Sequence, residues 1–463
     1  MVAEAVGRAV ERARAAQAEA ALWSQRRVDE VVAAVGWQCY REDNARRLAE
    51  LAYRETGFGN PEDLFRLHRK RVLGTMRDVH GATTVGVVED VPELGLRRLA
   101  KPLGVIAVAS PATAPCSGVA GNVIPMLKTR NAVIVSPNPR ARRSAAETVR
   151  LVRVALDGVG APVDLVQCLE IGGREAVTAL MSAADTVVAA GGAGTVRRAY
   201  ESGTPAISAG VGNATVIVDE TADLAAAAER IAVGTSFNHG TSCSSESNVF
   251  VEETVAGQFL AELARRGGHL CDAAEADRLR RALWPDGTSL NRELVGRSAV
   301  VIAAGAGIQL SDVDGTAVLV VPVADAHRPD PLLTEKLTPV LAVLTYRGFE
   351  AAVAGVMAVL DRNGRGHSCG IHTSRQDRVL ALAERMPVAR VMVNQTTLSN
   401  SGSFDNGMAF TPTVASGSWG GCSQSENVTW RHFLNHTVVS RPIRSVTPDE
   451  ATLFGPHRDV RGR

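Results

Sequence analysis

Continuous apolar runs recur along the first half of the chain and alternate with segments of helical pattern. Residues 105–109 and 132–135 are almost entirely valine, isoleucine and alanine, and comparable runs follow at 163–166, 186–189 and 215–218. Apolar residues at nearly every position are typical of parallel strands buried on both faces of a sheet. Helical stretches separate these runs, at residues 118–128, 143–156, 174–181 and 194–201. The alternation predicts an α/β fold with a doubly wound parallel sheet.

The chain before this sheet is expected to be helical and then to project as a hairpin. Residues 2–56 keep an approximate helical period. Asn60 and Pro61 have the residue types of a helix cap and a first helical position. Residues 82–100 contain two short β-type runs. We therefore expect a hairpin arm in this stretch.

A second α/β unit is predicted in the C-terminal half. Residues 349–361 have a helical pattern, and residues 416–423 are so rich in glycine that we expect them to form the wall of a pocket. Strands are expected at residues 300–304, 318–321, 340–344, 391–394 and 437–440.

Composition and charge limit the class of protein. A chain of 463 residues is long enough for two or three domains, and 45% hydrophobic with 21% charged residues fits a globular enzyme. The net charge of +1 gives no reason to expect nucleic acid or a membrane as partner, and no apolar run reaches membrane-spanning length. Seven scattered cysteines without a CxxC pair are typical of reduced thiols in a cytoplasmic protein.

One cysteine lies in a loop with the composition of a reactive site. Cys243 follows a helical run and precedes a β-type run, and residues 240–242 and 244–245 beside it are all small. They leave space next to the sulfur, and their hydroxyl and amide groups can stabilise a thiolate, the form that attacks. A buried cysteine that packs as a small hydrophobe is the alternative interpretation. Cys116 and Cys422 are the other candidate nucleophiles.

Segments spread over residues 20–445 resemble the aldehyde dehydrogenase superfamily and, within it, the coenzyme-A-acylating branch. Residues 237–246 are similar to the nucleophile loop of the family, and residues 335–339 to the segment whose glutamate holds the nicotinamide ribose. Residues 418–423 are close to the C-terminal signature of the acylating branch. Residues 203–207 and 210–213 fall where hydrolytic members carry a Glu-Leu-Gly-Gly motif. Shorter matches lie at 101–106, 127–132, 136–140, 366–368, 402–407 and 440–443, of which the last three resemble branch members that act on sulfoacetaldehyde.

The resemblance implies a covalent mechanism. The Cys243 thiolate would attack an aldehyde, a hydride would pass to NAD or NADP, and a thioester would remain on the sulfur. Hydrolytic members use a glutamate to activate water, but Ala209 and Gly210 occupy that position here. Without that base an external thiol is the natural acceptor, which predicts acyl transfer to coenzyme A. The alternatives are a hydrolytic enzyme in which Glu335 supplies the base, and a weakly active homologue that forms assemblies.

The resemblance also implies where the nicotinamide cofactor binds. A glycine cluster at 191–194 follows a strand and opens a helix, whose amino end could receive a phosphate group. Arginine at 140, after the second strand, could pair with the 2′-phosphate of NADP or be solvated, so NAD and NADP both stay candidates. No metal ligand set is expected. The predicted cofactor contacts are Ser136, Pro137, Arg140, Gly191, Gly192 and Glu335.

One departure from the family concerns the oxyanion. Ala114 stands where family members usually carry an asparagine whose amide supports the oxyanion, and Cys422 also replaces a usual asparagine. Support is therefore expected from another group, with Asn238 and Asn122 as candidates. Small polar residues near Cys243 predict a small polar aldehyde, with anionic aldehydes among the candidates.

The resemblance implies three parts in the chain. Residues 1–213 would bind the nicotinamide cofactor, residues 214–425 would carry the catalytic cysteine, and residues 426–463 would be an oligomerisation segment. We expect a homodimer or homotetramer in the cytoplasm.

Overall fold

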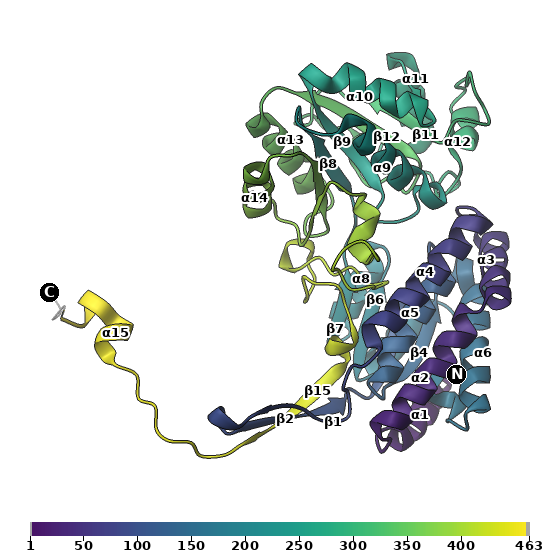
Figure 1. The fold of residues 1–463 in the computed structure, drawn as a ribbon. Coiled ribbons are helices and arrows are strands. Elements are labelled where there is room, and N and C mark those ends of the chain that lie inside the picture. The colour runs from purple at the N-terminus through teal and green to yellow at the C-terminus, as the bar shows by residue number, and fades with distance from the viewer. Residues whose placement is uncertain (1, 460–463) are drawn as a thin grey trace.

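Two parallel sheets form the body of the molecule, and an antiparallel arm projects from it (Figure 1). The computed structural model describes residues 2–459. The first sheet has the order β5-β4-β3-β6-β7, and every neighbouring pair is parallel, as the apolar runs predict. Its strands are β3 (Val105–Ser110), β4 (Ala132–Pro137), β5 (Val166–Cys168), β6 (Thr186–Ala190) and β7 (Ala206–Ala209).

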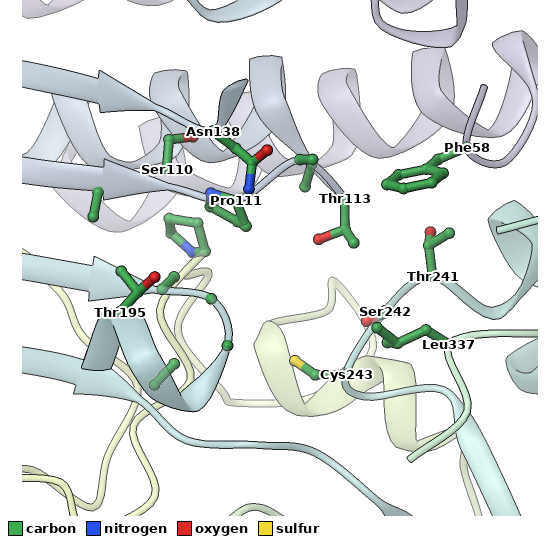
Figure 2. Close-up of a pocket in the computed structure, with 18 of the residues that line it drawn as sticks. Phe58, Ser110, Pro111, Thr113, Asn138, Thr195, Thr241, Ser242, Cys243 and Leu337 are labelled. Carbon is green, nitrogen blue, oxygen red and sulfur yellow. The ribbon is translucent and has the colours of Figure 1, made fainter. Parts of the chain in front are cut away.

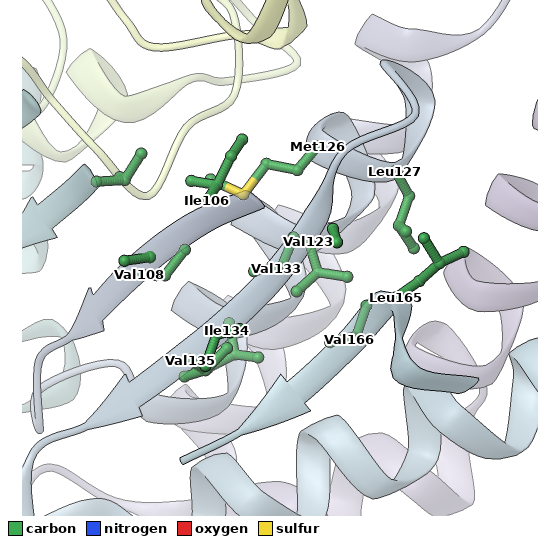
Figure 3. Packing of buried hydrophobic residues seen from close by; sticks show 14 of the residues in the cluster. Ile106, Val108, Val123, Met126, Leu127, Val133, Ile134, Val135, Leu165 and Val166 are labelled. Atoms are coloured by element: carbon green, nitrogen blue, oxygen red, sulfur yellow. The ribbon is translucent and has the colours of Figure 1, made fainter. Parts of the chain in front are cut away.

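Helices cover both faces of this sheet. α1 (Val2–Ala20) packs with α7 (Arg174–Ala183), while α5 (Pro115–Lys128) and α6 (Arg142–Gly158) lie under α2 (Gln25–Tyr40). Figure 3 shows side chains of α5, among them Val123 and Met126, packed against apolar residues of β3 and β4. Burial on both faces explains why these strands have no polar alternation. The remaining helices of this half are α3 (Glu42–Thr56), α4 (Pro61–Val79) and α8 (Ala193–Glu201).

The second sheet is larger and also parallel throughout. Its order is β10-β11-β12-β9-β8-β13-β14. Apolar clusters fill the space on either side, one with α9 and α10 and the other with α11, α12 and α13. The strands, in chain order, are β8 (Ala214–Val218), β9 (Glu246–Glu252), β10 (Gly268–Leu270), β11 (Val318–Pro322), β12 (Val340–Tyr346), β13 (Cys369–His372) and β14 (Val391–Val393). The helices are α9 (Leu224–Ser236), α10 (Glu253–Arg265), α11 (Ala273–Leu283), α12 (Ala299–Gly305), α13 (Phe349–Arg362) and α14 (Gln376–Arg385).

The predicted hairpin arm is confirmed and gains a third strand. β1 (Gly86–Val91) pairs antiparallel with β2 (Leu96–Pro102), and β15 (Leu434–Ser440) pairs with the other edge of β2. Beyond β15 the chain runs away from the body to a short helix, α15 (Glu450–Phe454) (Figure 1). The arm thus joins segments from both ends of the sequence.

Some elements differ from the sequence prediction. Residues 300–304, predicted as a strand, form helix α12, so that prediction is wrong. A short apolar run has the same appearance in a buried helix as in a strand, and here the Ser298 hydroxyl caps the first turn by accepting from the Val301 amide. Residues 163–165 form a 3₁₀ turn, and β5 begins at residue 166. The sequence did not predict strands β7 and β13, because neither segment contains a long apolar run.

The proposed division at residues 213 and 425 stays a prediction, and residues 460–463 of its last segment lie outside the described residues. Among the described helices, none combines the length and the apolar character needed to cross a membrane.

Candidate functional site

A cavity of about 1480 Å³ lies where the carboxyl ends of the first sheet face the loop that carries Cys243 (Figure 2). Ser110 ends β3, Ser136 lies near the end of β4, Gly191 follows β6, and Ala209 ends β7. Ligands of open parallel sheets bind at this edge, because the loops there change direction and leave a crevice. The cavity therefore places Cys243 opposite the predicted cofactor edge.

The backbone before Cys243 is held in an uncommon conformation. Asn238 and His239 have positive φ of 48° and 54°, which costs free energy for residues other than glycine. The Asn238 side chain is held at both ends: Oδ1 accepts from the Asn60 amide at 3.2 Å, and Nδ2 donates to Thr241 Oγ1 at 2.6 Å. A Cβ at Gly212 would lie 2.0 Å from the Cys243 carbonyl oxygen. Close packing therefore fixes where the cysteine lies.

A buried histidine contacts the cysteine sulfur. His367 Nε2 lies 3.3 Å from Cys243 Sγ, and its Nδ1 lies 3.0 Å from Ser368 Oγ. Ser368 Oγ accepts from Asn400 Nδ2 at 2.8 Å, so the ring is oriented by a chain of hydrogen bonds. The buried Arg390 guanidinium donates to the His367 carbonyl oxygen at 3.3 Å and so helps to hold the turn that carries His367. This geometry lets the imidazole exchange a proton with the sulfur.

Burial keeps both groups neutral. The pKa of Cys243 is raised to about 11, mainly by burial and then by the negative charge of Glu335, although the Ser244 hydrogen bond and Arg71 act in the opposite direction. The pKa of His367 is lowered to about 3 by burial and by the nearby Arg390 charge. Near neutral pH the site therefore holds a thiol beside a neutral imidazole, and burial opposes transfer of the thiol proton to His367 before Cys243 attacks an electrophile.

Glu335 lines the cavity near the cysteine. Its Oε1 accepts from the Gly212 amide at 3.0 Å, and burial raises its pKa to about 7. The neighbouring Lys336 is buried and donates from Nζ to Ser247 Oγ at 2.8 Å, which anchors the segment. Glu335 is thus a carboxylate that titrates near neutrality within electrostatic reach of the nucleophile.

The position of the hydrolytic base offers no carboxylate and little room. Ala209 lines the cavity with a methyl group. A Cβ at Gly210 would lie 3.0 Å from Ser416 Oγ and 3.3 Å from the Gly420 carbonyl oxygen, so a larger side chain would crowd the glycine-rich wall predicted at 416–423.

All of the predicted cofactor residues line the cavity. Ser136, Pro137 and Arg140 come from the end of β4, and Gly191 and Gly192 from the turn between β6 and α8. No side chain caps the amino end of α8. The Arg140 guanidinium lies 3.4 Å from Glu293 Oε1 on the surface. These placements agree with a cofactor along this edge, while the individual contacts stay predictions.

The oxyanion candidates lie in different surroundings. Ala114 lines the cavity, as the sequence predicts, and so does Asn238, whose amide is already hydrogen-bonded. Asn122 is buried in α5, accepts from Thr413 Oγ1 at 3.4 Å, and lies outside the cavity wall formed by the described residues. Figure 2 shows the hydroxyl of Thr113, a residue that sequence reasoning missed, pointing into the cavity.

The other candidate nucleophiles are buried. Burial raises the pKa of Cys116 to about 12, and its Sγ contacts the Leu48 carbonyl oxygen at 3.6 Å rather than the cavity. Cys422 Sγ accepts from Ser208 Oγ at 3.4 Å and is buried. Cys243 is half-buried and lines the cavity, which favours it over both.

Comparison with known proteins decides the family. Residues 1–274 match the aldehyde dehydrogenase family. The chain belongs to this family. It is 40% identical to an acylating sulfoacetaldehyde dehydrogenase of Bilophila wadsworthia, over 97% of this chain and 98% of that protein. An acetylating succinate-semialdehyde dehydrogenase of Clostridium kluyveri is 37% identical over 92% and 93% of the two chains.

Solved structures give the same result. The crystal structure of an acetylating aldehyde dehydrogenase from Geobacillus thermoglucosidasius superposes with a TM-score of 0.92 at 31% identity, covering 97% of this chain and 98% of that one. These comparisons confirm the fold, the family and the acylating branch that the sequence predicts.

Cys243 and the cofactor residues predicted from the sequence line one cavity, but sequence reasoning gave no role to His367, which contacts Cys243. Residues 364–368 read only as a glycine-rich turn, although His367 was part of a matched segment. A polar residue inside such a turn was the available signal. Nothing in the pattern indicated that the turn would reach Cys243, because the two positions lie 124 residues apart.

The first prediction concerns the charge of Glu335 on the thiol. Glu335→Gln should lower the pKa of Cys243, because it removes a negative charge and keeps a hydrogen-bond acceptor for Gly212. Iodoacetamide labelling of the Cys243 peptide, followed by mass spectrometry across pH 6–10, measures this. Below the Glu335 pKa of about 7 the variant and wild type should react alike, and above it the variant should react up to about tenfold faster, the effect of one pKa unit. Equal rates at every pH would contradict the assigned electrostatics.

The second prediction concerns Ala114. One oxyanion donor is worth about 2.7–4 kcal/mol, or roughly 10²–10³ in rate. If the native site already has a replacement donor, Ala114→Asn should slow the best substrate and give acetaldehyde no large gain. Measured kcat/KM values for both aldehydes decide this. A gain of roughly tenfold or more on both would show that the site simply lacks a donor.

Proposed function

We propose that this chain is a coenzyme-A-acylating aldehyde dehydrogenase that interconverts a small anionic aldehyde and its acyl-CoA, using NAD or NADP. The observation that carries this function is the Cys243–His367 pair beside a position where Ala209 and Gly210 replace the carboxylate of hydrolytic enzymes. The sulfoacetaldehyde and succinate-semialdehyde activities named for its relatives support the choice of an anionic substrate.

Cys243 and His367 have different roles in the proposed reaction. His367 takes the thiol proton as Cys243 attacks the aldehyde carbon, and the Cys243 backbone amide is a candidate donor to the oxyanion. NAD or NADP, when bound, accepts the hydride. The proton taken from Cys243 is released from His367 to solvent before the second half of the reaction. The coenzyme A thiol then attacks the thioester on Cys243, and the deprotonated His367 imidazole is the proposed acceptor of that thiol's proton.

The cofactor is proposed to lie along the edge of the first sheet. The uncapped amino end of α8 at Gly192 favours an anionic pyrophosphate. Glu335 also lines the cavity, where its carboxylate could accept from ribose hydroxyls. Binding there would compete with its hydrogen bond from Gly212.

Hydrolysis of the thioester is the second candidate function. Glu335 favours it, because a carboxylate with a pKa of about 7 near Cys243 could activate water. Its hydrogen bond to Gly212 and the cofactor role implied for it both oppose this use. In this alternative, NADH would form without coenzyme A, and Glu335→Gln would abolish that activity.

The third prediction tests the proposed function. With sulfoacetaldehyde or succinic semialdehyde, steady NAD(P)H formation should require coenzyme A and yield the acyl-CoA. Cys243→Ala should reduce turnover to below a few per cent while circular dichroism stays unchanged, because the substitution removes only the sulfur of a half-buried side chain. Long-chain aldehydes should give lower kcat/KM, since the cavity wall around Cys243 is rich in small polar residues. Fast turnover without any thiol would contradict the proposal.

The fourth prediction concerns assembly. We propose that the arm formed by β1, β2 and β15, with the tail beyond it, is an oligomer contact in a homodimer or homotetramer. Val446 is 80% exposed and Leu453 60%, which is unfavourable for large apolar side chains in a monomer. Light scattering should find an oligomer for the full chain and a smaller species for a chain that ends at residue 433. A monomeric full chain would contradict this. The cytoplasmic location stays a prediction.

A further inference from the structure

One face of helix α4 brings positive charge to the cavity. Leu67, Lys70 and Arg71 all line the cavity, and their spacing of three and four residues places them on the same side of the helix. The neighbouring Arg69 points elsewhere, because its guanidinium lies 4.3 Å from the centre of the Tyr40 ring. The basic stretch at residues 66–71 is therefore divided between the cavity and the outer surface.

Arg71 has no carboxylate partner. Its only hydrogen bond in residues 2–459 runs from Nη1 to Ser117 Oγ at 3.3 Å, and no carboxylate of those residues lies within 4.0 Å of the guanidinium. The partly buried Arg378, by contrast, lies 2.6 Å from Asp219 Oδ2. A half-buried cation without a counter-ion is costly, so an anionic ligand would stabilise it.

The aliphatic part of the Arg71 side chain packs against helix α5. A Cβ at Gly121 of α5 would lie 3.2 Å from Arg71 Cδ, so the absence of a side chain there lets the stem pack against the helix. Ser117, the hydrogen-bond partner, lies in the first turn of α5, whose amino end has no side-chain cap because Ala114 occupies it. The positive end of the helix dipole adds to the positive charge of Arg71.

Arg71 acts on the nucleophile electrostatically. Its charge lowers the pKa of Cys243, while burial lowers the pKa of Arg71 itself to about 10, so the guanidinium stays charged at neutral pH. Sulfoacetaldehyde has a single methylene between its sulfonate and its aldehyde carbon. Arg71 lines the same cavity as Cys243, so its charge could hold the anionic group while the aldehyde carbon faces the Cys243 thiol.

We infer that Arg71 is the specificity-determining residue that binds the anionic group of the aldehyde, with Lys70 assisting at the cavity mouth. The guanidinium offers paired N–H donors that match the oxygen atoms of a sulfonate or a carboxylate. Lys70 is more exposed and near Asp405, so it contributes charge rather than a fixed contact. This inference rests on the proposed function, because it assigns the residue that selects an anionic substrate.

The test compares a charged and an uncharged aldehyde in two variants. Arg71→Met keeps the stem and removes the charge, and Arg69→Met is the matched control on the same helix. For Arg71→Met, kcat/KM on sulfoacetaldehyde should fall about 10- to 100-fold more than kcat/KM on propionaldehyde, the range for a hydrogen bond to a charged group. The loss on propionaldehyde reports only the effect of the Arg71 charge on the Cys243 thiol. Arg71→Lys should recover part of the loss, and Arg69→Met should change neither substrate. Equal losses on both aldehydes, or no loss on sulfoacetaldehyde, would overturn the assignment.

Binding of ethanesulfonate separates this inference from the proposed function. It has the sulfonate but no aldehyde, so calorimetry with the full chain measures the anion site alone. Wild type should bind it, and Arg71→Met should bind it at least tenfold more weakly. If wild type prefers propionaldehyde as substrate, the proposed anionic function fails, yet loss of ethanesulfonate binding in Arg71→Met would still support the site. Equal binding by both proteins would overturn it whatever the aldehyde preference.

Discussion

The Cys243 thiol is half-buried in the cavity wall, where burial opposes the thiolate that the chemistry requires. Burial and the Glu335 charge raise its pKa to about 11, and only weaker influences, the Ser244 hydrogen bond and the Arg71 charge, oppose them. Near neutral pH Cys243 is therefore a thiol and not a preformed thiolate. The protein places a neutral imidazole 3.3 Å from the sulfur instead, so that proton transfer can accompany attack on the aldehyde.

The lack of the carboxylate base of hydrolytic enzymes favours coenzyme A over water as the acceptor of the acyl group. A thioester in this cavity is hydrolysed only if some group activates water, and the position that carries the base in hydrolytic enzymes holds Ala209 and Gly210. The close contacts around Gly210 show that the wall is packed for small residues there. Among the carboxylates of residues 2–459, Glu335 is the one whose charge raises the pKa of Cys243, and it already accepts a hydrogen bond from the Gly212 amide.

Much of the fold was predictable because buried parallel strands have a distinctive composition. The runs at 105–109 and 132–135 became β3 and β4, and the hairpin arm was also found. The strand predicted at residues 300–304 was wrong because a short apolar run does not distinguish a strand from a buried helix. In the site, Cys243 could be found from its local loop. His367 and Arg71 could not, since their importance depends on contacts between segments far apart in the sequence.

The central claim is that an acyl group forms on Cys243 and waits for coenzyme A. Intact-protein and peptide mass spectrometry of the full chain, after mixing with NAD or NADP and sulfoacetaldehyde but no thiol, tests it directly. The account predicts a mass increase of one acyl group on the Cys243 peptide that persists until coenzyme A is added and then disappears as acyl-CoA forms. An acyl group on Cys422 or Cys116, or one that water removes as fast as coenzyme A does, would contradict it.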